Sequence, residues 1–154
     1  MATRTCVIDK EDKKIKLQPT LKEIKNFNHI ITYKNVIPFS SIMFRRNYLK
    51  SIGGIPKYLK YAIDYGIILK FLKENRKGFF LIPKILTTCR ALRNSLTYDE
   101  KYKLIRIKDT INLLFFSLEN LKLDIYEKYN IYLRITINYI SYFLIKTFKI
   151  SKWF

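Results

Sequence analysis

The chain has 154 residues, of which 49% are apolar and 16% aromatic, which argues against disorder and predicts one domain with a buried core. Its two cysteines, Cys6 and Cys89, lie far apart and it has one histidine, so neither a disulfide framework nor a structural zinc site is expected. The net charge of +18 predicts attraction to nucleic acid, an acidic lipid surface or a phosphorylated ligand, although a genome-wide compositional bias would produce the same charge.

The sequence shows no targeting or membrane-spanning segment. The N-terminal stretch MATRTCVIDKEDKK lacks the apolar core of a secretory signal. The uncharged run 135–145 is bounded by Arg134 and Lys146, and it is shorter than the roughly 18 apolar residues of a spanning helix. We therefore expect a cytoplasmic protein, with the cytoplasmic face of a membrane as a candidate location.

The first part of the chain predicts a hairpin followed by a short helix. Residues 3–8 have the β-branched content of a strand, and residues 15–17 can return beside it after a polar turn. Residues 21–28 are typical of a short helix, with Thr20 as its N-cap.

The middle part predicts short strands around an amphipathic helix. Residues 41–44 read as a buried strand, and 45–51 as a helical turn closed by Gly53 and Gly54, where positive φ is easily adopted. A helix is expected over 61–75 from the helical spacing of its apolar residues, ending at Gly78. Two further short strands, 79–82 and 85–89, are expected to be broken at Pro83 and followed by a polar loop over 90–97.

Two long helices are predicted at the C-terminal end. Apolar residues at steps of three and four over 104–121 indicate a helix with one face to bury. A second helix is expected over about 124–148, with apolar residues in many directions and a narrow polar stripe. The predicted fold class is mixed α/β, with short strands and an amphipathic helix followed by two long helices.

Asp64 is the candidate for chemistry. It is the only acid between Glu23 and Glu74, in a stretch rich in Lys and Arg. It falls in the first turn of the predicted helix, where the helix dipole favours a negative charge by roughly 0.3–1 kcal/mol. The alternative to this charge effect is that Asp64 takes part in catalysis.

Two other residues are weaker candidates for catalysis. His29 has no neighbouring acid to orient it as a general base, and Cys89 is expected to be inert core and not a nucleophile.

An ordered series of residues within 5–97 resembles the second half of a family 2 glycosyltransferase. That family shows a small-residue strand ending in Arg, a short helix, Gly-Gly, an acid opening an amphipathic helix, and a later strand ending in Arg before a Ser-rich loop. The matching residues here are Ser40-Ser41, Arg45-Arg46, Gly53-Gly54, Asp64 followed by Ile67 and Leu69, Pro83, and Arg90 before Ser95.

The resemblance implies an A-type glycosyltransferase fold that uses a nucleotide-sugar donor, a glycan or lipid-linked acceptor and Mg²⁺ or Mn²⁺. Asp64 would be the general base that deprotonates the acceptor hydroxyl in an inverting transfer. Arg45, Arg46 and Arg90 would border a donor diphosphate or an anionic acceptor. The resemblance also assigns Ser41, Gly53, Gly54 and Ser95 to donor or acceptor binding.

Three departures from the family pattern limit this expectation. Ile63 stands where the family usually has an acid, and Gly66 where a further acid is common. No Asp-x-Asp metal motif occurs in the sequence, so no metal ligand is expected in this chain. We therefore expect the acceptor-side half of such an enzyme over 1–97, inactive alone, and a separate helical region over 98–154.

Two other functions follow from the charge. The basic, aromatic segment 129–154 could lie in an anionic membrane interface, or its helix could pack against 104–121 as an ordinary pair. A nucleic-acid-binding protein ranks lower, because no helix-turn-helix, zinc finger or RRM signature is present.

Overall fold

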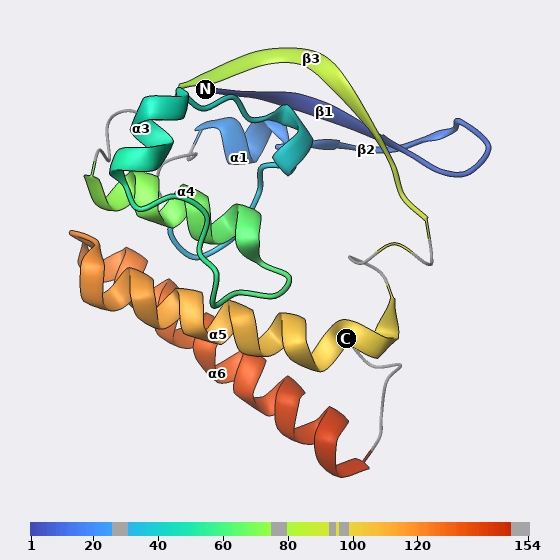
Figure 1. Cartoon of the computed structure of the whole chain (residues 1–154). Coiled ribbons are helices and arrows are strands. Elements are labelled where there is room, and N and C mark those ends of the chain that lie inside the picture. The colour runs from blue at the N-terminus through green and yellow to red at the C-terminus, as the bar shows by residue number, and fades with distance from the viewer. Residues whose placement is uncertain (26–30, 75–79, 93–94, 96–98, 149–154) are drawn as a thin grey trace.

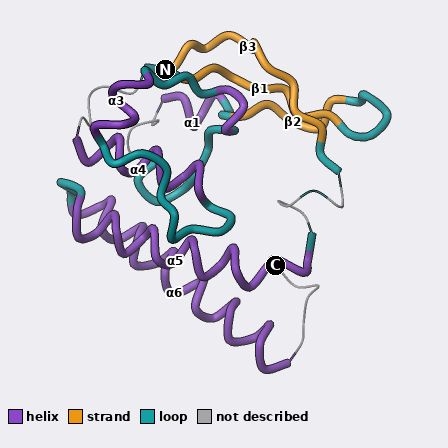
Figure 2. The backbone as a smooth tube through the Cα atoms, in the orientation of Figure 1, coloured by secondary structure: helices purple, strands orange, loops and turns teal. Residues whose placement is uncertain are grey.

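The computed structural model describes residues 1–25, 31–74, 80–92, 95 and 99–148, and it confirms a mixed α/β fold. Its elements form layers, with a three-stranded sheet, then helix α4, then the helix pair α5 and α6 (Figures 1 and 2). α5 lies between α4 and α6, so α6 is the outermost layer (Figure 1).

The sheet is mixed and has the strand order β2-β1-β3. β1 (Ala2–Ile8) and β2 (Lys14–Gln18) form the predicted antiparallel hairpin, in which Cys6 is opposite Leu17. β3 (Leu81–Arg90) pairs in parallel with the other edge of β1. The carboxyl ends of the parallel strands β1 and β3 therefore lie at the same end of the sheet.

The predicted break at Pro83 is wrong, because β3 continues through it. Thr3 is paired with Ile82 and Arg4 with Ile85, which leaves Pro83 and Lys84 as a bulge between two paired segments. A bulge accepts proline because its missing N–H is not needed in the ladder. Residue 79 of the expected strand lies outside the described residues.

The predicted strand over 41–44 is also wrong. The 3-10 helix η1 (Phe39–Ser41) occupies its start, and Ile42 makes only an isolated bridge to Ala2. The backbone N–H and the hydroxyl of Ser41 both donate to the carbonyl of Pro38, at 3.0 and 2.8 Å. This local turn satisfies the donors that a strand would have directed to a neighbouring strand.

Two predicted short helices are confirmed within the described residues. α1 (Leu21–Lys25) begins with a capping box, in which the Thr20 N–H donates to Glu23 and the Glu23 N–H donates to the Thr20 hydroxyl. α3 (Arg46–Ser51) is followed by Gly53 and Gly54 at φ of 80° and 61°. The expected continuation of α1 over 26–28, and the helix stop at Gly78, lie outside the described residues.

α4 (Ile63–Glu74) is the centre of the core. Its residues Tyr65, Ile68, Leu69 and Leu72 are buried in one cluster with the start of β1, the loop 31–37 and Leu113 of α5. The helix thus joins the sheet layer to the helical layer.

The two long helices are confirmed as α5 (Lys103–Asn120) and α6 (Ile125–Phe148). They pack against each other through a second buried cluster that contains Leu114, Ile131 and Ile135. α6 begins with a capping box of Asp124 and the fully buried Glu127. No helix within the described ranges is long and apolar enough to cross a membrane.

A buried carboxylate connects α5 to the start of α4. Asp109 of α5 is 5% exposed, and its Oδ2 accepts from the backbone N–H groups of Lys60, Tyr61 and Ala62 at 2.9, 2.8 and 3.3 Å. These three residues immediately precede α4, so Asp109 fixes the position at which that helix begins. Backbone N–H groups at a helix start need such acceptors, because they have no partner within the helix.

Asp109→Ala should therefore lower the free energy of unfolding by about 1–3 kcal/mol, since three buried donors lose their acceptor. Urea unfolding measures this change. The matched control is Glu119→Ala at an exposed position of the same helix, which should change stability by no more than about 0.5 kcal/mol. Equal stability of the two variants would contradict this role of Asp109.

Candidate active site

Asp64 occupies the first turn of α4, as predicted, and its carboxylate is oriented by the loop that precedes η1. Asn35 Nδ2 donates to Asp64 Oδ2 at 2.9 Å, while Asn35 Oδ1 accepts from the backbone N–H of Ile37 at 3.1 Å. Because the Asn35 amide is held from both ends, it fixes the direction of the carboxylate. Asp64 is half-buried at this position.

Burial raises the pKa of the Asp64 carboxyl above its ordinary value, because a desolvated carboxylate is less stable than the neutral acid. Hydrogen bonds from the Tyr65 and Asp64 backbone N–H groups and from Asn35 lower this pKa, but burial is the larger effect. A carboxylate whose pKa is shifted toward neutrality accepts a proton more readily than an exposed one. The environment of Asp64 thus suits a general base.

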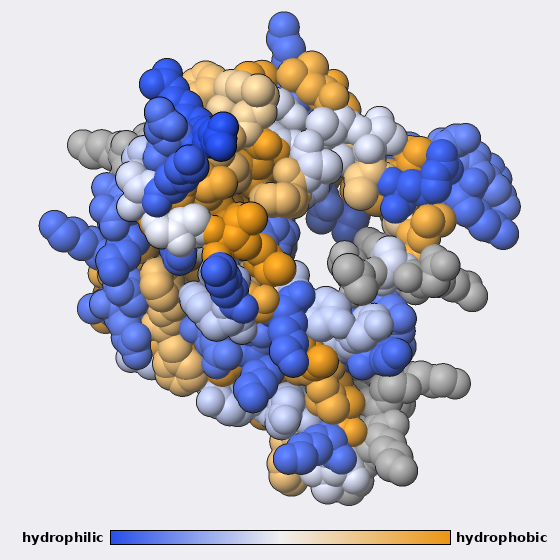
Figure 3. Space-filling view, viewed as in Figure 1, coloured by the Kyte–Doolittle hydropathy of each residue, from blue (hydrophilic) through white to orange (hydrophobic). Residues whose placement is uncertain are grey.

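Asp64 and Asn35 border two clefts. The sheet-side cleft has a volume of about 590 Å³, and the helix-side cleft a volume of about 440 Å³. The space-filling view shows the molecule hollowed between the sheet and the helices (Figure 3). The sheet-side cleft is also lined by Val7, Lys16, Gln18, residues 36–40, Cys89, Arg90, Ala91 and Ser95. The helix-side cleft is also lined by Tyr33, Lys34, residues 60–63, Tyr65, Arg106, Thr110 and Arg134.

The sheet-side cleft brings together four of the residues that the resemblance selected, Ser40, Asp64, Arg90 and Ser95. Arg90 is at the end of β3, and its guanidinium holds the hairpin turn. Nη1 donates to the carbonyls of Asp9 and Lys10 at 2.9 and 3.2 Å, and Nη2 pairs with Asp12 Oδ1 at 2.6 Å. Arg90 therefore closes one side of the cleft and at the same time anchors the hairpin to β3.

The helix-side cleft is strongly cationic. Lys34, Lys60, Arg106 and Arg134 line it, and Asp64 is the only acid among its described lining residues. Lys34 Nζ pairs with Glu23 at 2.9 Å, and Arg106 Nη1 donates to the carbonyl of Asp99 at 2.7 Å. A concave site with this charge favours a ligand that carries an anionic group.

Tyr65, which is among the residues that line the helix-side cleft, has a buried hydroxyl. Tyr65 is 4% exposed, and its Oη has no hydrogen-bond partner among the described residues. A buried polar atom of this kind is uncommon, since most buried hydroxyls are paired.

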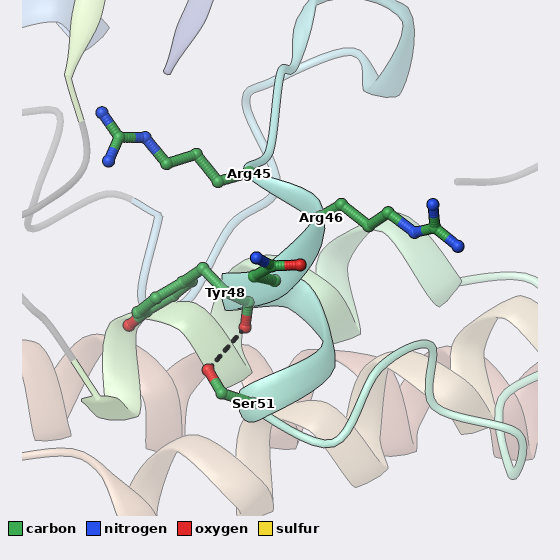
Figure 4. A pocket seen from close by; sticks show the side chains of 5 residues that line it. Arg45, Arg46, Tyr48 and Ser51 are labelled. Atoms are coloured by element: carbon green, nitrogen blue, oxygen red, sulfur yellow. Dashed lines mark hydrogen bonds between the residues drawn. The ribbon is translucent and has the colours of Figure 1, made fainter.

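Arg45 and Arg46 do not border either cleft. They line a separate shallow hollow at the start of α3 with Asn47, Tyr48 and Ser51. Their side chains extend in opposite directions from the backbone, and the Ser51 hydroxyl donates to the carbonyl of Tyr48 at 2.9 Å (Figure 4). The two guanidinium groups therefore do not converge on one ligand.

The remaining predicted binding residues have local partners. Ser41 is buried and bonded to Pro38, while its neighbour Ser40 lines the sheet-side cleft. The carbonyls of Gly53 and Gly54 accept from Lys70 Nζ at 3.1 and 3.2 Å, which ties the loop after α3 to α4. Of the family-selected positions, the structure thus gathers Ser40, Asp64, Arg90 and Ser95 around the sheet-side cleft.

The prediction that Cys89 is inert core is wrong. Cys89 is exposed at the end of an edge strand and lines the sheet-side cleft. His29 lies outside the described residues.

Two of the departures from the family pattern, Gly66 and Ile63, have packing reasons. A Cβ on Gly66 would collide with Leu59 and lie 2.9 Å from Pro56 Cγ, so a side chain there would require these neighbours to shift. Ile63 packs against the main core cluster, where a second carboxylate would be desolvated without a partner. The fold therefore accommodates a single acid at the start of α4.

Sequence reasoning missed Asn35 and Asp109, the two residues that position Asp64. The interactions span 29 residues for Asn35 and up to 49 for Asp109, and no local pattern encodes such contacts. One signal was present for Asp109: it lies four residues before the buried Leu113, on the inward face of a predicted helix. A carboxylate on such a buried face requires hydrogen-bond donors from elsewhere in the fold.

Comparisons of the chain with models of protein families, with curated proteins and with solved structures give no match. Among the described residues, no group of three or more His, Cys, Asp or Glu side chains is placed to hold a metal ion. The described residues thus offer no such group for the Mg²⁺ or Mn²⁺ that the resemblance implies.

Asp64→Asn should raise the free energy of unfolding at pH 7, because it removes a desolvated charge but keeps an oxygen for Asn35. A raised folded-state pKa means that ionised Asp64 destabilises the folded state above that pKa. This effect disappears as the pH falls below the ordinary value of about 3.9, where the acid is protonated in both states.

Urea unfolding of the wild type and Asp64→Asn at pH 7 and near pH 3.5 measures this difference. The exposed Glu119→Gln serves as the control and should change stability by less than about 0.5 kcal/mol at either pH. A loss of stability in Asp64→Asn at pH 7 would contradict the proposed burial effect.

Proposed function

We propose that this chain forms the acceptor side of an inverting glycosyltransferase related to family 2, with Asp64 as the general base. The observation that carries the proposal is the Asp64 carboxylate, which is oriented by Asn35 at the start of α4 and borders two clefts. A base on a rigid helix, between two sites for reactants, matches what a transfer between a donor and an acceptor requires.

The reaction assigns Asp64 one proton. The acceptor hydroxyl gives its proton to the Asp64 carboxylate, and its oxygen forms a bond to the anomeric carbon of the donor sugar. The bond between that carbon and the nucleoside diphosphate breaks on the opposite face, and the diphosphate leaves with the electron pair. The products are a glycoside of inverted configuration, a nucleoside diphosphate and protonated Asp64.

The sheet-side cleft is the proposed site of the donor sugar. Val7, near the end of β1, and Cys89 and Arg90, at the end of β3, line it. Ligands of open α/β sheets bind at the carboxyl ends of parallel strands, which is where this cleft lies.

The helix-side cleft is the proposed site of the acceptor. Lys60, Arg106 and Arg134 are among the residues that line it. These groups suit an acceptor that carries a phosphate near its reactive hydroxyl, as a phosphate-linked glycan or lipid does. Asp64, shared by both clefts, would reach the hydroxyl between them.

A donor half with the nucleotide-binding residues and an Asp-x-Asp motif would complete the site, and the open edge of β3 is where we place its contact. Among the described residues no strand pairs with this edge. Ile85 and Leu86 of β3 are both exposed. The edge of β3 therefore leaves room for further structure to extend the sheet.

With a donor half supplied by a polypeptide that carries the Asp-x-Asp motif, the chain should transfer sugar, and Asp64→Asn should lower kcat by roughly 10²–10⁴-fold. Release of nucleoside diphosphate measures the rate. Glu119→Gln, an exposed substitution of equal chemistry, should retain the wild-type rate. Full transfer by Asp64→Asn would refute the assignment of the base.

A further inference from the structure

α6 presents an apolar, aromatic face away from the rest of the protein. Tyr129, Tyr132, Leu133, Ile137, Ile140 and Phe143 lie on this face and are between 42% and 64% exposed. At about 100° per residue they fall on one side of the helix, opposite the buried Ile131 and Ile135. We refer to these six residues as the outer face of α6.

The outer face is exposed although α6 is fully packed on its other side. The inner face contacts α5 through Ile131 and Ile135, and Glu127 is buried at the first turn. α6 is also the outermost layer of the molecule (Figure 1). An exposed apolar patch of this kind on a well-packed helix marks a surface that meets another apolar phase or partner.

The borders of the outer face carry positive charge. On the helical wheel, Lys128 and Lys146 follow one border and Arg134 follows the other, and all three are exposed. The sequence has no acid after Glu127, which is itself buried. The face and its borders therefore combine tyrosines, aliphatic residues and cations, which is the composition of helices that lie in a membrane interface.

We propose that the outer face of α6 docks onto an anionic lipid surface, with the helix parallel to the membrane plane. A helix of 24 residues is about 36 Å long, so it would lie along the surface, and its tyrosines would occupy the headgroup region. Charge favours this occupant over a second copy of the chain, since pairing two copies would bring together their cationic borders and two net charges of +18. This inference does not depend on the role of Asp64.

Vesicle co-sedimentation of the full chain tests the proposal, using phosphatidylcholine vesicles with and without phosphatidylglycerol. The chain should bind the anionic vesicles and not the neutral ones. Ile140→Ser with Phe143→Ser should weaken binding roughly tenfold by removing apolar contact. Lys128→Gln with Lys146→Gln should weaken it by about twenty-five-fold, at about fivefold for each charge.

The matched control is Ile15→Ser with Phe80→Ser, which changes the same residue types at similarly exposed positions outside α6. It should bind as the wild type does. Equal binding by the control and by Ile140→Ser with Phe143→Ser would overturn the proposal, as would equal binding to neutral and anionic vesicles. A dimer in sedimentation that Ile140→Ser with Phe143→Ser dissociates, without vesicle binding, would assign the face to a second copy instead.

Discussion

The carboxylate of Asp109, with its three backbone donors, determines where the central helix of this fold begins. It lies inside the helical layer and accepts from the residues that lead into α4. Replacing it would leave three buried N–H groups without an acceptor, so the loop and the first turn of α4 would have to move. The core cluster, which joins α4 to the sheet and to α5, depends on this position.

Asp64 takes its properties from the same constraint. Because the start of α4 is fixed from the side of α5, Asn35 can hold the carboxylate from the other side, in a partly desolvated position between two clefts. The raised pKa of Asp64 follows from this burial. A desolvated charge retained at the meeting point of two clefts is typical of a functional group rather than of a stabilising one.

The sequence predicted those features whose cause is local. Spacing of apolar residues located α5 and α6, and the polar turn between β-branched runs located the hairpin. Long-range contacts decided the rest. Pairing with β1 carries β3 past Pro83 as a bulge, and Asn35 and Asp109 reach α4 across 29 and 49 residues. For the same reason, order along the chain placed Arg90 and Ser95 beside Asp64 but could not show that Arg45 and Arg46 lie apart.

The most direct test of this account is an NMR titration of the Asp64 side-chain carboxyl in the wild type and in Asp109→Ala. If the fixed start of α4 keeps Asp64 desolvated, its pKa in the wild type should lie above the ordinary value of about 3.9 and should fall toward that value in the variant. An ordinary pKa in the wild type, or a raised pKa that Asp109→Ala leaves unchanged, would contradict it.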